Sequence, residues 1–424
     1  MSMRPENPRM PQDTCLDPTE RDALDVTDAR HRIRSAIHPL LEKERIALKD
    51  SLNRILAEDL RAPFNVPPHA NSAMDGYAVR SADLPHTQQR RLTVIGTALA
   101  GAPFAGEVAA GQCVRIMTGG VLPRGCDTVI MQEHAVREGD VITINSGHSA
   151  GQHVRPAGED LAAGQQVFKA GKRISAADLG LLASLGISVV TVIRRPRVAF
   201  FSTGDELRAV GEPLTEGAIY DSNRYTLLGL LLQTGVAPLD LGVVRDRQDE
   251  LRAALIRAAA QADAVITTGG VSVGDADFVR DTLAGLGEVE FWKVGMKPGR
   301  PFTFGRIAQA WFFGLPGNPV STMATYYQFV QPALRQLMGE EAHPPLQFKV
   351  PCVTALKKAP GRMEFQRGIL ETTAAGDTVV RSTGGQGSNL LRSMSEANCF
   401  IVLPAAWGDV AAGTLVEVQP FAGL

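Results

Sequence analysis

The sequence lacks the cysteine pattern of a disulfide-stapled or zinc-binding protein. Its 424 residues hold five cysteines, scattered, odd in number and without CxxC spacing. This excludes a disulfide framework and a Cys-rich zinc site, and it favours a reducing compartment. The N-terminal stretch MSMRPENPRMPQ has no apolar core, so it does not read as a signal peptide. We therefore expect a cytoplasmic protein.

Long hydrophobic runs and an excess of one charge are also missing. The longest uncharged run, Leu179–Ile193, is too short to span a membrane and is interrupted by two glycines. The net charge is −2, from 43 Lys+Arg and 45 Asp+Glu, so no polyanion-attracting field is present. We expect neither a membrane nor a nucleic acid as a partner. A hydrophobic content of 44% is that of a globular protein, and the length suggests about three domains.

The first part of the chain changes character three times. Residues 1–20 are Pro-rich and polar, and we predict that they are disordered. Residues 21–66 begin with helical apolar spacing, and residues 161–195, which mix helix and strand, are predicted to complete this N-terminal helical domain. Residues 67–160 carry short alternating strands between Gly and Pro turns, which predicts a β-rich domain. Thr27 or Asp28 is the candidate N-cap of the first helix.

The second part of the chain is more regular. Residues 196–342 alternate apolar strands with amphipathic helices, which predicts a doubly wound, mostly parallel α/β sheet. One of these helices, SNRYTLLGLLLQT, is expected to end at Gly235. Residues 343–424 return to a strand pattern and predict a small barrel or sandwich. The fold class is therefore multidomain, α/β plus β.

Two strands of the predicted sheet end alike, in FFSTGDE and ITTGGVSVGDAD. Ligands bind beyond the carboxyl ends of strands in an open parallel sheet, so these loops should share one edge. Amides at a helix N-terminus favour an anion, and carboxylates beside a phosphate suggest Mg²⁺. The groups expected there are Thr203, Asp205, Glu206, Thr268, Gly269, Gly270, Ser272, Asp275 and Asp277.

Each of these residues also has a simpler interpretation. Thr-Gly at a strand end is common turn chemistry, and Asp275 or Asp277 could cap the next helix. Asp246, before DELRAAL, is likewise most simply an N-cap. The loop matches neither the P-loop pattern nor GxGxxG, so taken alone it does not separate a phosphate site from a turn.

The following strands favour a binding site. FWKVGMKPGRPFTFG places Lys293, Lys297 and Arg300 around a Lys-Pro-Gly turn. FFGLPGNPVSTM then ends a strand in a turn held by Pro316 and Pro319 and opens a helix. A solvated charge run explains Arg300 but not the rigid turn, so we predict a mixed site for a polyanion and a metal at this edge.

Other polar residues lie in glycine turns outside the sheet and predict no role by themselves. A turn or surface position explains each of them: Asp75, Thr118, Asp160, Arg367 and Ser388. The eight histidines form no ligand cluster, and no Ser/His/Asp or Cys/His set stands out. Covalent catalysis is not indicated.

Several motifs together resemble one family. SAMDGYAVR, RIMTGG, FFSTGDEL, IYDSNRY, TTGGVSVGDADF, VGMKPGRPFTFG, GLPGNPVS, FQRG and GGQGSN occur in the order found in molybdopterin molybdenumtransferases, the molybdenum insertases similar to the E domain of gephyrin. The resemblance runs from roughly residue 22 to the C-terminus. It implies a helical N-terminal region, a β-rich domain, an α/β domain and a C-terminal β-barrel. It also implies an elongated homodimer with a cleft shared between subunits.

The resemblance implies a reaction as well: Mg²⁺-dependent insertion of molybdate into the dithiolene of adenylylated molybdopterin, with release of AMP. Asp277 would bind Mg²⁺ and the nucleotide phosphate, with Asp275 and Ser272 beside it. The residues implied around molybdate are Lys293, Lys297, Arg367, Ser388, Pro316 and Pro319. Those implied to line the cleft are Glu206, Asp246, Asp75, Thr118 and Asp160, with Asp75 reaching across the dimer.

Two other functions stay open at this point. One is a nucleotidyltransferase that adenylylates molybdopterin, against which the lysine turns and large β-domains speak. The other is a scaffold or carrier that docks a partner through its C-terminal domain, as gephyrin does with receptors. The charges gathered on one sheet edge disfavour this second function. For the enzyme itself, other molybdenum-cofactor pathway proteins are candidate partners. Arg300 is a further point, because some relatives carry Lys there and a guanidinium presents a fork rather than a point charge.

Overall fold

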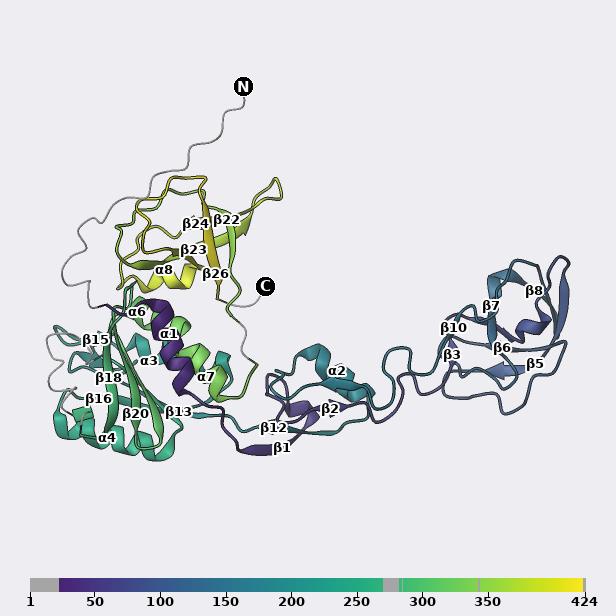
Figure 1. Cartoon of the computed structure of the whole chain (residues 1–424), viewed down its shortest axis with the longest axis horizontal. Helices are drawn as coiled ribbons and strands as arrows, with labels where there is room; N and C mark the ends of the chain where they lie inside the picture. The colour runs from purple at the N-terminus through teal and green to yellow at the C-terminus, as the bar shows by residue number, and fades with distance from the viewer. Residues whose placement is uncertain (1–22, 270–281, 284, 342–343, 422–424) are drawn as a thin grey trace, which may run out of the picture. The chain divides into compact units, whose positions relative to one another are not determined.

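The computed structural model describes residues 23–269, 282–283, 285–341 and 344–421 (Figure 1). The chain divides into two compact units. One unit comprises the chain up to Lys43 and again from Ile193 onwards, and the other comprises Glu44–Val192. The second unit is therefore inserted into the sequence of the first. In the described part of the chain, no helix is long and apolar enough to cross a membrane.

The inserted unit contains a six-stranded sheet in the order β7-β4-β6-β5-β9-β8. Its strands are β4 (Gly76–Val79), β5 (Arg90–Ala98), β6 (Gln112–Ile116), β7 (Thr128–Met131), β8 (Ala135–Glu138) and β9 (Val141–Ile144). Side chains alternate between two cores, so that Tyr77 and Val79 enter one and Ala78 enters the other. The predicted β-rich character of this segment is confirmed.

A smaller part of this unit consists of paired strands and one helix: β1 (Lys43–Ala47), β12 (Val189–Ile193), β2 (Leu60–Arg61), β11 (Gln166–Phe168) and α2 (Ala176–Ser184). The short strands β3 (Asn71–Ser72) and β10 (Val154–Arg155) instead lie beside the six-stranded sheet, and Val154 packs against one of its two cores. β1 pairs with β12, β2 with β11 and β3 with β10. Ser175 and Asp178 form a capping box at the start of α2.

The first helix does not join this smaller part, which corrects the predicted N-terminal domain. α1 (Val26–Ala36) belongs to the first unit, where it packs against η5 (Tyr326–Val330, a π-helical turn) and α7 (Gln331–Leu337). The side chain of Gln336 donates to the carbonyl oxygens of Arg34 and Ile37 at 2.9 and 2.6 Å. The N-cap is Asp25, not Thr27 or Asp28, and it accepts from the Thr27 amide at 2.7 Å.

The first unit is built around a six-stranded sheet in the order β16-β13-β17-β21-β20-β18. β16, β13, β17 and β21 are parallel, whereas β20 and β18 are antiparallel to their neighbours. The strands are β13 (Arg197–Thr203), β16 (Ala237–Val244), β17 (Ala264–Thr268), β18 (Gly287–Lys293), β20 (Pro301–Ile307) and β21 (Ala310–Leu315). The short pair β14 (Leu207–Arg208) and β15 (Ile219–Tyr220) follows β13.

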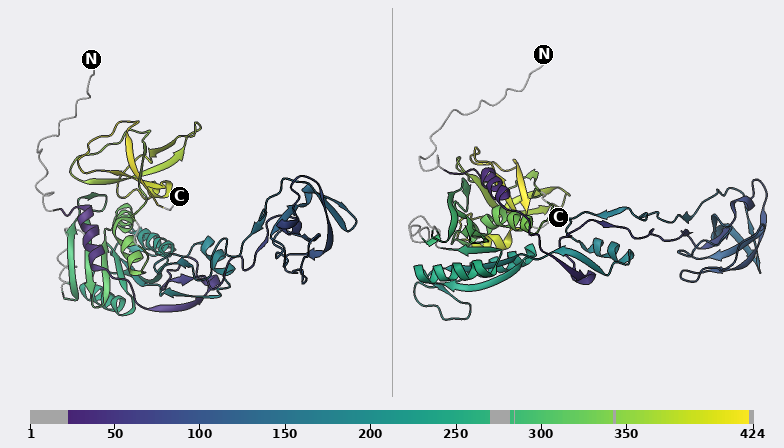
Figure 2. Two further views of the ribbon diagram at one scale, coloured as in Figure 1. Left: turned by 45° about the vertical axis from the view of Figure 1, so that its right-hand side comes forward. Right: turned by 60° about the horizontal axis from the view of Figure 1, so that its bottom comes forward.

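Helices pack on this sheet in two groups (Figure 2). α4 (Gln248–Gln261) shares a core with Ala199, Phe201 and Val265 from alternate strand positions. α3 (Ser222–Thr234) contacts β13, β16 and α6 (Pro319–Thr325), and it ends at Gly235, as predicted, in the left-handed conformation. The chain runs from β13 to β16 through α3 and then crosses to β17 through α4, so the connections reverse direction between β13 and β17.

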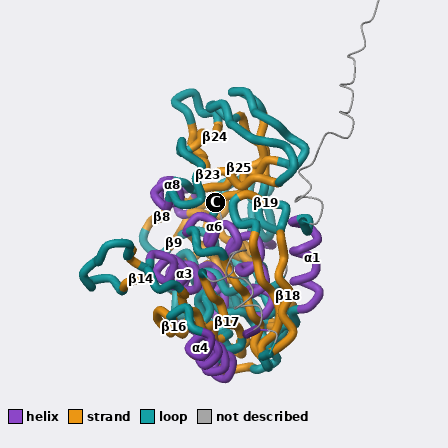
Figure 3. Tube along the Cα trace, turned by 90° about the vertical axis from the view of Figure 1, so that its left-hand side faces the viewer, coloured by secondary structure: helices purple, strands orange, loops and turns teal. Residues whose placement is uncertain are grey.

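The C-terminal sheet has the order β19-β23-β25-β26-β22, with β24 on β23. Its elements are β19 (Met296–Lys297), β22 (Phe348–Pro351), β23 (Met363–Thr372), β24 (Thr378–Ser382), α8 (Leu391–Glu396), β25 (Cys399–Leu403) and β26 (Leu415–Pro420). A bridge between Cys352 and Val380 brings the chain after β22 next to β24. α8 lies beside α6 (Figure 3). Because β19 comes from the α/β segment, it links the two six-stranded sheets of this unit.

Candidate functional site

The carboxyl edge of the α/β sheet brings together residues from two strands. Thr203 ends β13 and Thr268 ends β17, and the parallel register sets Ser202 opposite Thr268. Gly269 follows with a φ of +91°, and a β-carbon there would overlap the carbonyl oxygen of Thr203. A left-handed φ and the close backbone approach both require glycine. This edge is the switch point at which ligands bind in open α/β sheets.

Buried polar side chains gather under the same edge. Asn223, at the start of α3, donates to Thr268 Oγ1 at 2.8 Å and to the Gly317 carbonyl at 2.7 Å. Asp221 is the N-cap of α3, and its Oδ1 accepts from the Arg224 amide at 3.1 Å. The bonds of Asn223 tie the start of α3 to the end of β17 and to the loop after β21.

Three oxygens in this cluster have no partner within the described part of the chain: Thr203 Oγ1, Asp221 Oδ2 and Asn223 Oδ1. A buried, unpaired acceptor costs about 1–3 kcal/mol, so the cluster marks a place where a ligand or cation would complete the bonding. Neither Asp221 nor Asn223 was predicted as a site residue from the sequence. The available signal was a run of short polar residues directly before an amphipathic helix.

Pro316 and Pro319 hold the next loop of the edge. The Pro316 carbonyl accepts from Thr268 Oγ1 at 3.0 Å and from Thr322 Oγ1 at 2.6 Å. Pro319 is the first residue of α6, whose N-cap Asn318 makes no side-chain cap bond. The start of this seven-residue helix is tied to the C-terminal sheet, because the Val320 amide donates to the Ser388 carbonyl at 3.1 Å.

The predicted cations occupy different environments. Lys293 is exposed at the end of β18. Lys297 Nζ lies 3.2 Å from Glu364 Oε1, and the Lys297 side chain is 47% exposed. Arg300 is half-buried beyond the Lys-Pro-Gly turn. This turn packs on α6, because a β-carbon at Gly299 would meet the side chain of Thr325.

Arg367 is fully buried, not a surface residue. Its guanidinium donates to the carbonyls of Gly385 and Gly387 at 3.3 and 3.0 Å and to Ser393 Oγ at 3.0 Å. Burial lowers the pKa of Arg367 to about 10, which leaves it charged at neutral pH. In this structure Arg367 organises the loop that carries Ser388.

Glu206 and Asp246 are exposed, in the loops after β13 and β16. The interpretation of Asp246 as an N-cap is wrong. The N-cap of α4 is Arg247, which makes no side-chain cap bond. The loops after two parallel strands thus each carry a carboxylate beyond the same sheet edge.

In the inserted unit the structure brings Asp75 and Thr118 together. Asp75 Oδ1 accepts from the Thr118 amide at 2.7 Å and from Thr118 Oγ1 at 2.8 Å. The amide bond, followed by the hydroxyl bond, lowers the pKa of Asp75 and keeps it ionised. Asp160 is exposed, and its amide donates to the Val66 carbonyl at 3.0 Å.

The remaining predicted residues, Gly270, Ser272, Asp275 and Asp277, lie outside the described residues. Among the residues that are described, no group of three His, Cys, Asp or Glu side chains could hold a metal ion. The unpartnered oxygens of Thr203 and Asp221 still fit the preference of Mg²⁺ for oxygen ligands. The described edge is therefore compatible with Mg²⁺.

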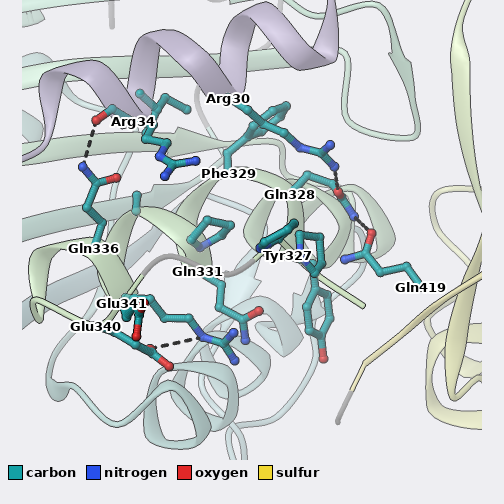
Figure 4. A pocket seen from close by; sticks show the side chains of 16 residues that line it. Arg30, Arg34, Tyr327, Gln328, Phe329, Gln331, Gln336, Glu340, Glu341 and Gln419 are labelled. Atoms are coloured by element: carbon teal, nitrogen blue, oxygen red, sulfur yellow. Dashed lines mark hydrogen bonds and ion pairs between the residues drawn. The ribbon is translucent and has the colours of Figure 1, made fainter. Parts of the chain in front are cut away.

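A separate cavity of about 350 Å³ lies between α1, η5 and α7 (Figure 4). Its polar lining includes Arg30, which donates to Gln328, and Arg335, whose Nε lies 3.8 Å from Glu340. None of the described residues predicted for the site lines this cavity. This cavity and the sheet edge are therefore different places in the fold.

Known protein families match nearly the whole chain. Three family models match in succession: the MoeA N-terminal region (domain I and II) over residues 24–186, a probable molybdopterin binding domain over 199–336, and the MoeA C-terminal region (domain IV) over 349–421. A solved structure of a molybdopterin biosynthesis MoeA protein from Pyrococcus horikoshii superposes with a TM-score of 0.83 at 29% identity, covering 94% of this chain and all of that one.

Curated relatives agree with the family models. A molybdopterin molybdenumtransferase from Haemophilus influenzae is 45% identical over 94% of this chain and 98% of its own length. Another from Nostoc is 37% identical over 86% of each chain. Gephyrin from Dictyostelium discoideum is 33% identical over 89% of this chain and 59% of gephyrin. The chain belongs to the molybdopterin molybdenumtransferase family and is a transferase enzyme.

Proposed function

We propose that this transferase inserts molybdate into the dithiolene of adenylylated molybdopterin in a Mg²⁺-dependent reaction that releases AMP. The observation that carries the proposal is what meets at the carboxyl edge of the α/β sheet. The buried oxygens of Thr203, Asp221 and Asn223 that have no partner in the described chain lie there. The Lys-Pro-Gly turn and the loop that opens α6 connect this edge to the C-terminal sheet. The relatives' names supply the substrate class, and the edge supplies groups suited to anions and a cation.

The proposed division of labour follows the described geometry. Gly269 and Thr203 would let the nucleotide phosphate approach the backbone at the ends of β13 and β17. Lys293 and Lys297 would neutralise the two anions, molybdate and pyrophosphate, so that they can lie close together. Ser388 would bind molybdate from the loop that Arg367 organises, and Pro316 and Pro319 would hold the facing loop.

Mg²⁺, when bound, would orient the bridging phosphates and ease the departure of AMP. Asp277 and Asp275 are the proposed ligands, with Ser272 and Gly270 from the same loop beside them. Glu206 and Asp246 would line the cleft on this side. Asp75, Thr118 and Asp160 would line it from the β-rich domain of a second subunit in a homodimer. We further propose a cytoplasmic enzyme with a doubly wound α/β domain and a C-terminal β-barrel.

The proposal is tested by measuring AMP release from adenylylated molybdopterin as a function of Mg²⁺ and molybdate. We expect release by the wild type, and a loss of at least a hundredfold in Asp277→Ala. The matched control is Asp249→Ala, an exposed aspartate in the first turn of α4, which should retain wild-type release. ATP consumption that requires molybdopterin would instead indicate a nucleotidyltransferase. No release by the wild type would leave the carrier function.

A further inference from the structure

Lys297 reaches the C-terminal sheet through a short strand. β19 pairs in parallel with the start of β23, which sets Lys297 beside Glu364. Their side chains form an ion pair of 3.2 Å between Nζ and Oε1. The Glu364 side chain is 4% exposed and that of Lys297 is 47% exposed, so the lysine meets solvent while its partner does not.

Glu364 is held rigidly in this position. Its second oxygen, Oε2, accepts from Gln366 Nε2 at 2.8 Å, and Gln366 also donates to the Lys357 carbonyl at 2.9 Å. Gln366 is itself 3% exposed. Each carboxylate oxygen of Glu364 thus accepts from one side-chain donor, Lys297 at Oε1 and Gln366 at Oε2.

The surroundings of Glu364 are rich in buried cations. Lys358 is 5% exposed and donates to the carbonyls of Ala359, Ala405 and Trp407 at 3.1, 3.4 and 2.9 Å. Burial lowers the pKa of Lys358, and the charge of Glu364 partly offsets this fall. Glu364 also opposes the effect of burial on the pKa of Arg367. One buried carboxylate therefore balances several cations near the proposed oxyanion site.

We propose that Glu364 is the resident counter-ion of Lys297: it positions the ammonium and competes with the anionic substrate for it, which keeps oxyanion binding weak and reversible. The inference rests on the proposed function, because it assumes that Lys297 faces molybdate. It assigns Glu364 as a positioning residue that acts through Lys297. In a partly desolvated site, the Coulomb attraction between Lys297 and a bound dianion depends strongly on nearby charges. Removal of the negative charge of Glu364 should therefore tighten anion binding. Loss of a residue with a merely structural role should weaken it.

The experiment measures the affinity of the full-length protein for molybdate alone, by titration calorimetry. Glu364→Gln should bind molybdate at least tenfold more tightly than the wild type. Glu364→Asp keeps the charge but withdraws it by one methylene group, and it should bind about threefold more tightly. In a Lys297→Met background both changes should alter the affinity by less than twofold, because the residue through which Glu364 acts is gone.

Glu371→Gln is the matched control. It makes the same exchange on the same strand, where the exposed Glu371 pairs with Arg381 at 3.1 Å, and it should bind molybdate within twofold of the wild type. The Asp variant keeps the test decisive if Glu364→Gln does not fold. Unchanged or weaker binding by both Glu364 variants would overturn the inference and leave the proposed function standing. A wild type that does not bind molybdate would instead overturn the proposed function at this site.

Discussion

At the scale of the residue, Thr118 lowers the pKa of the Asp75 carboxylate through two bonds, first that of its amide and then that of its hydroxyl. Thr118→Val keeps the amide bond to Asp75 and removes the hydroxyl bond, so the pKa of Asp75 should rise toward its usual value and remain below it. NMR titration of the Asp75 carboxyl carbon measures this. Thr143→Val, in the same sheet, should leave the Asp75 pKa unchanged. An unchanged Asp75 pKa in Thr118→Val would show that the hydroxyl bond does not contribute to the shift.

The sign of the stability effect follows from the direction of this shift. Because the pKa of Asp75 is lowered in the folded protein, its contribution to stability is complete above the unfolded value of about 3.9. The contribution is lost as the pH falls through the folded value. The hydroxyl-free variant should therefore lose its contribution at a slightly higher pH than the wild type.

Gly269 makes a prediction about the backbone. An alanine at this position combines a φ of +91° with overlap on Thr203, so Gly269→Ala should lower the free energy of unfolding by about 1–3 kcal/mol. The control is Gly180→Ala inside α2, where a β-carbon meets nothing within 4 Å. That change should raise stability by about 0.5–1 kcal/mol. Calorimetry of both variants decides, and a stable Gly269→Ala protein would contradict the argument.

At the scale of the element, Arg367 links β23 to the loop before α8. A lysine cannot reproduce the three bonds of the guanidinium, so Arg367→Lys should increase amide exchange in residues 385–390 at least tenfold. Hydrogen-exchange mass spectrometry measures this, with Arg381→Lys at a partly exposed position on β24 as control. Loss of molybdate binding with unchanged exchange would mean that Arg367 contacts the substrate directly.

Element types were largely predictable from the sequence, because they depend on local patterns. Gly235 ends α3 as expected, since a helix followed by a left-handed residue favours glycine. The caps were harder: Asp25 rather than Thr27 caps α1, and Arg247 rather than Asp246 precedes α4. Several short polar neighbours can each serve as a cap, and the choice depends on where the chain turns.

The packing partners were not predictable in the same way. The apolar stripe of α1 says that it needs an apolar partner, but not that the partner is α7. β19 pairs with a strand outside its own predicted domain, and FQRG reads as a surface turn although Arg367 is buried. For the candidate site, the sequence predicted that the ends of two strands are neighbours, and the structure places Thr203 and Thr268 there. Asp221, Asn223 and Glu364 became visible only through their contacts.

At the scale of the whole molecule, Arg194 anchors the chain on both sides of the inserted unit. It pairs with Glu42 and makes two bonds to Asp263 at 2.8 and 3.0 Å, and Asp263 also accepts from the Arg197 amide at 2.7 Å. Burial alone would raise the pKa of Asp263, but these bonds from Arg194 and Arg197 reverse the effect and lower it.

Asp263→Asn should therefore lower the free energy of unfolding by about 1–3 kcal/mol at pH 7. Because the folded pKa is lowered, the difference from the wild type should be complete above the unfolded value of about 3.9 and should shrink as the pH falls through the folded value. Urea unfolding at several pH values measures it. Asp140→Asn, which disrupts an exposed pair with Arg137, is the control, and equal losses in both variants would refute the anchor.

The pairing of α1 with α7 has a consequence for biosynthesis. Their contacts join residues roughly 300 positions apart, with the entire inserted unit made in between. At translation speeds of 5–20 residues per second, α7 is synthesised roughly 15–60 s after α1. During that time Val26, Ala29 and Ile33 have no native surface to cover them, whereas the inserted unit can fold as soon as it leaves the exit tunnel. Nascent chains arrested after the inserted unit and before α7 should therefore bind chaperones through α1.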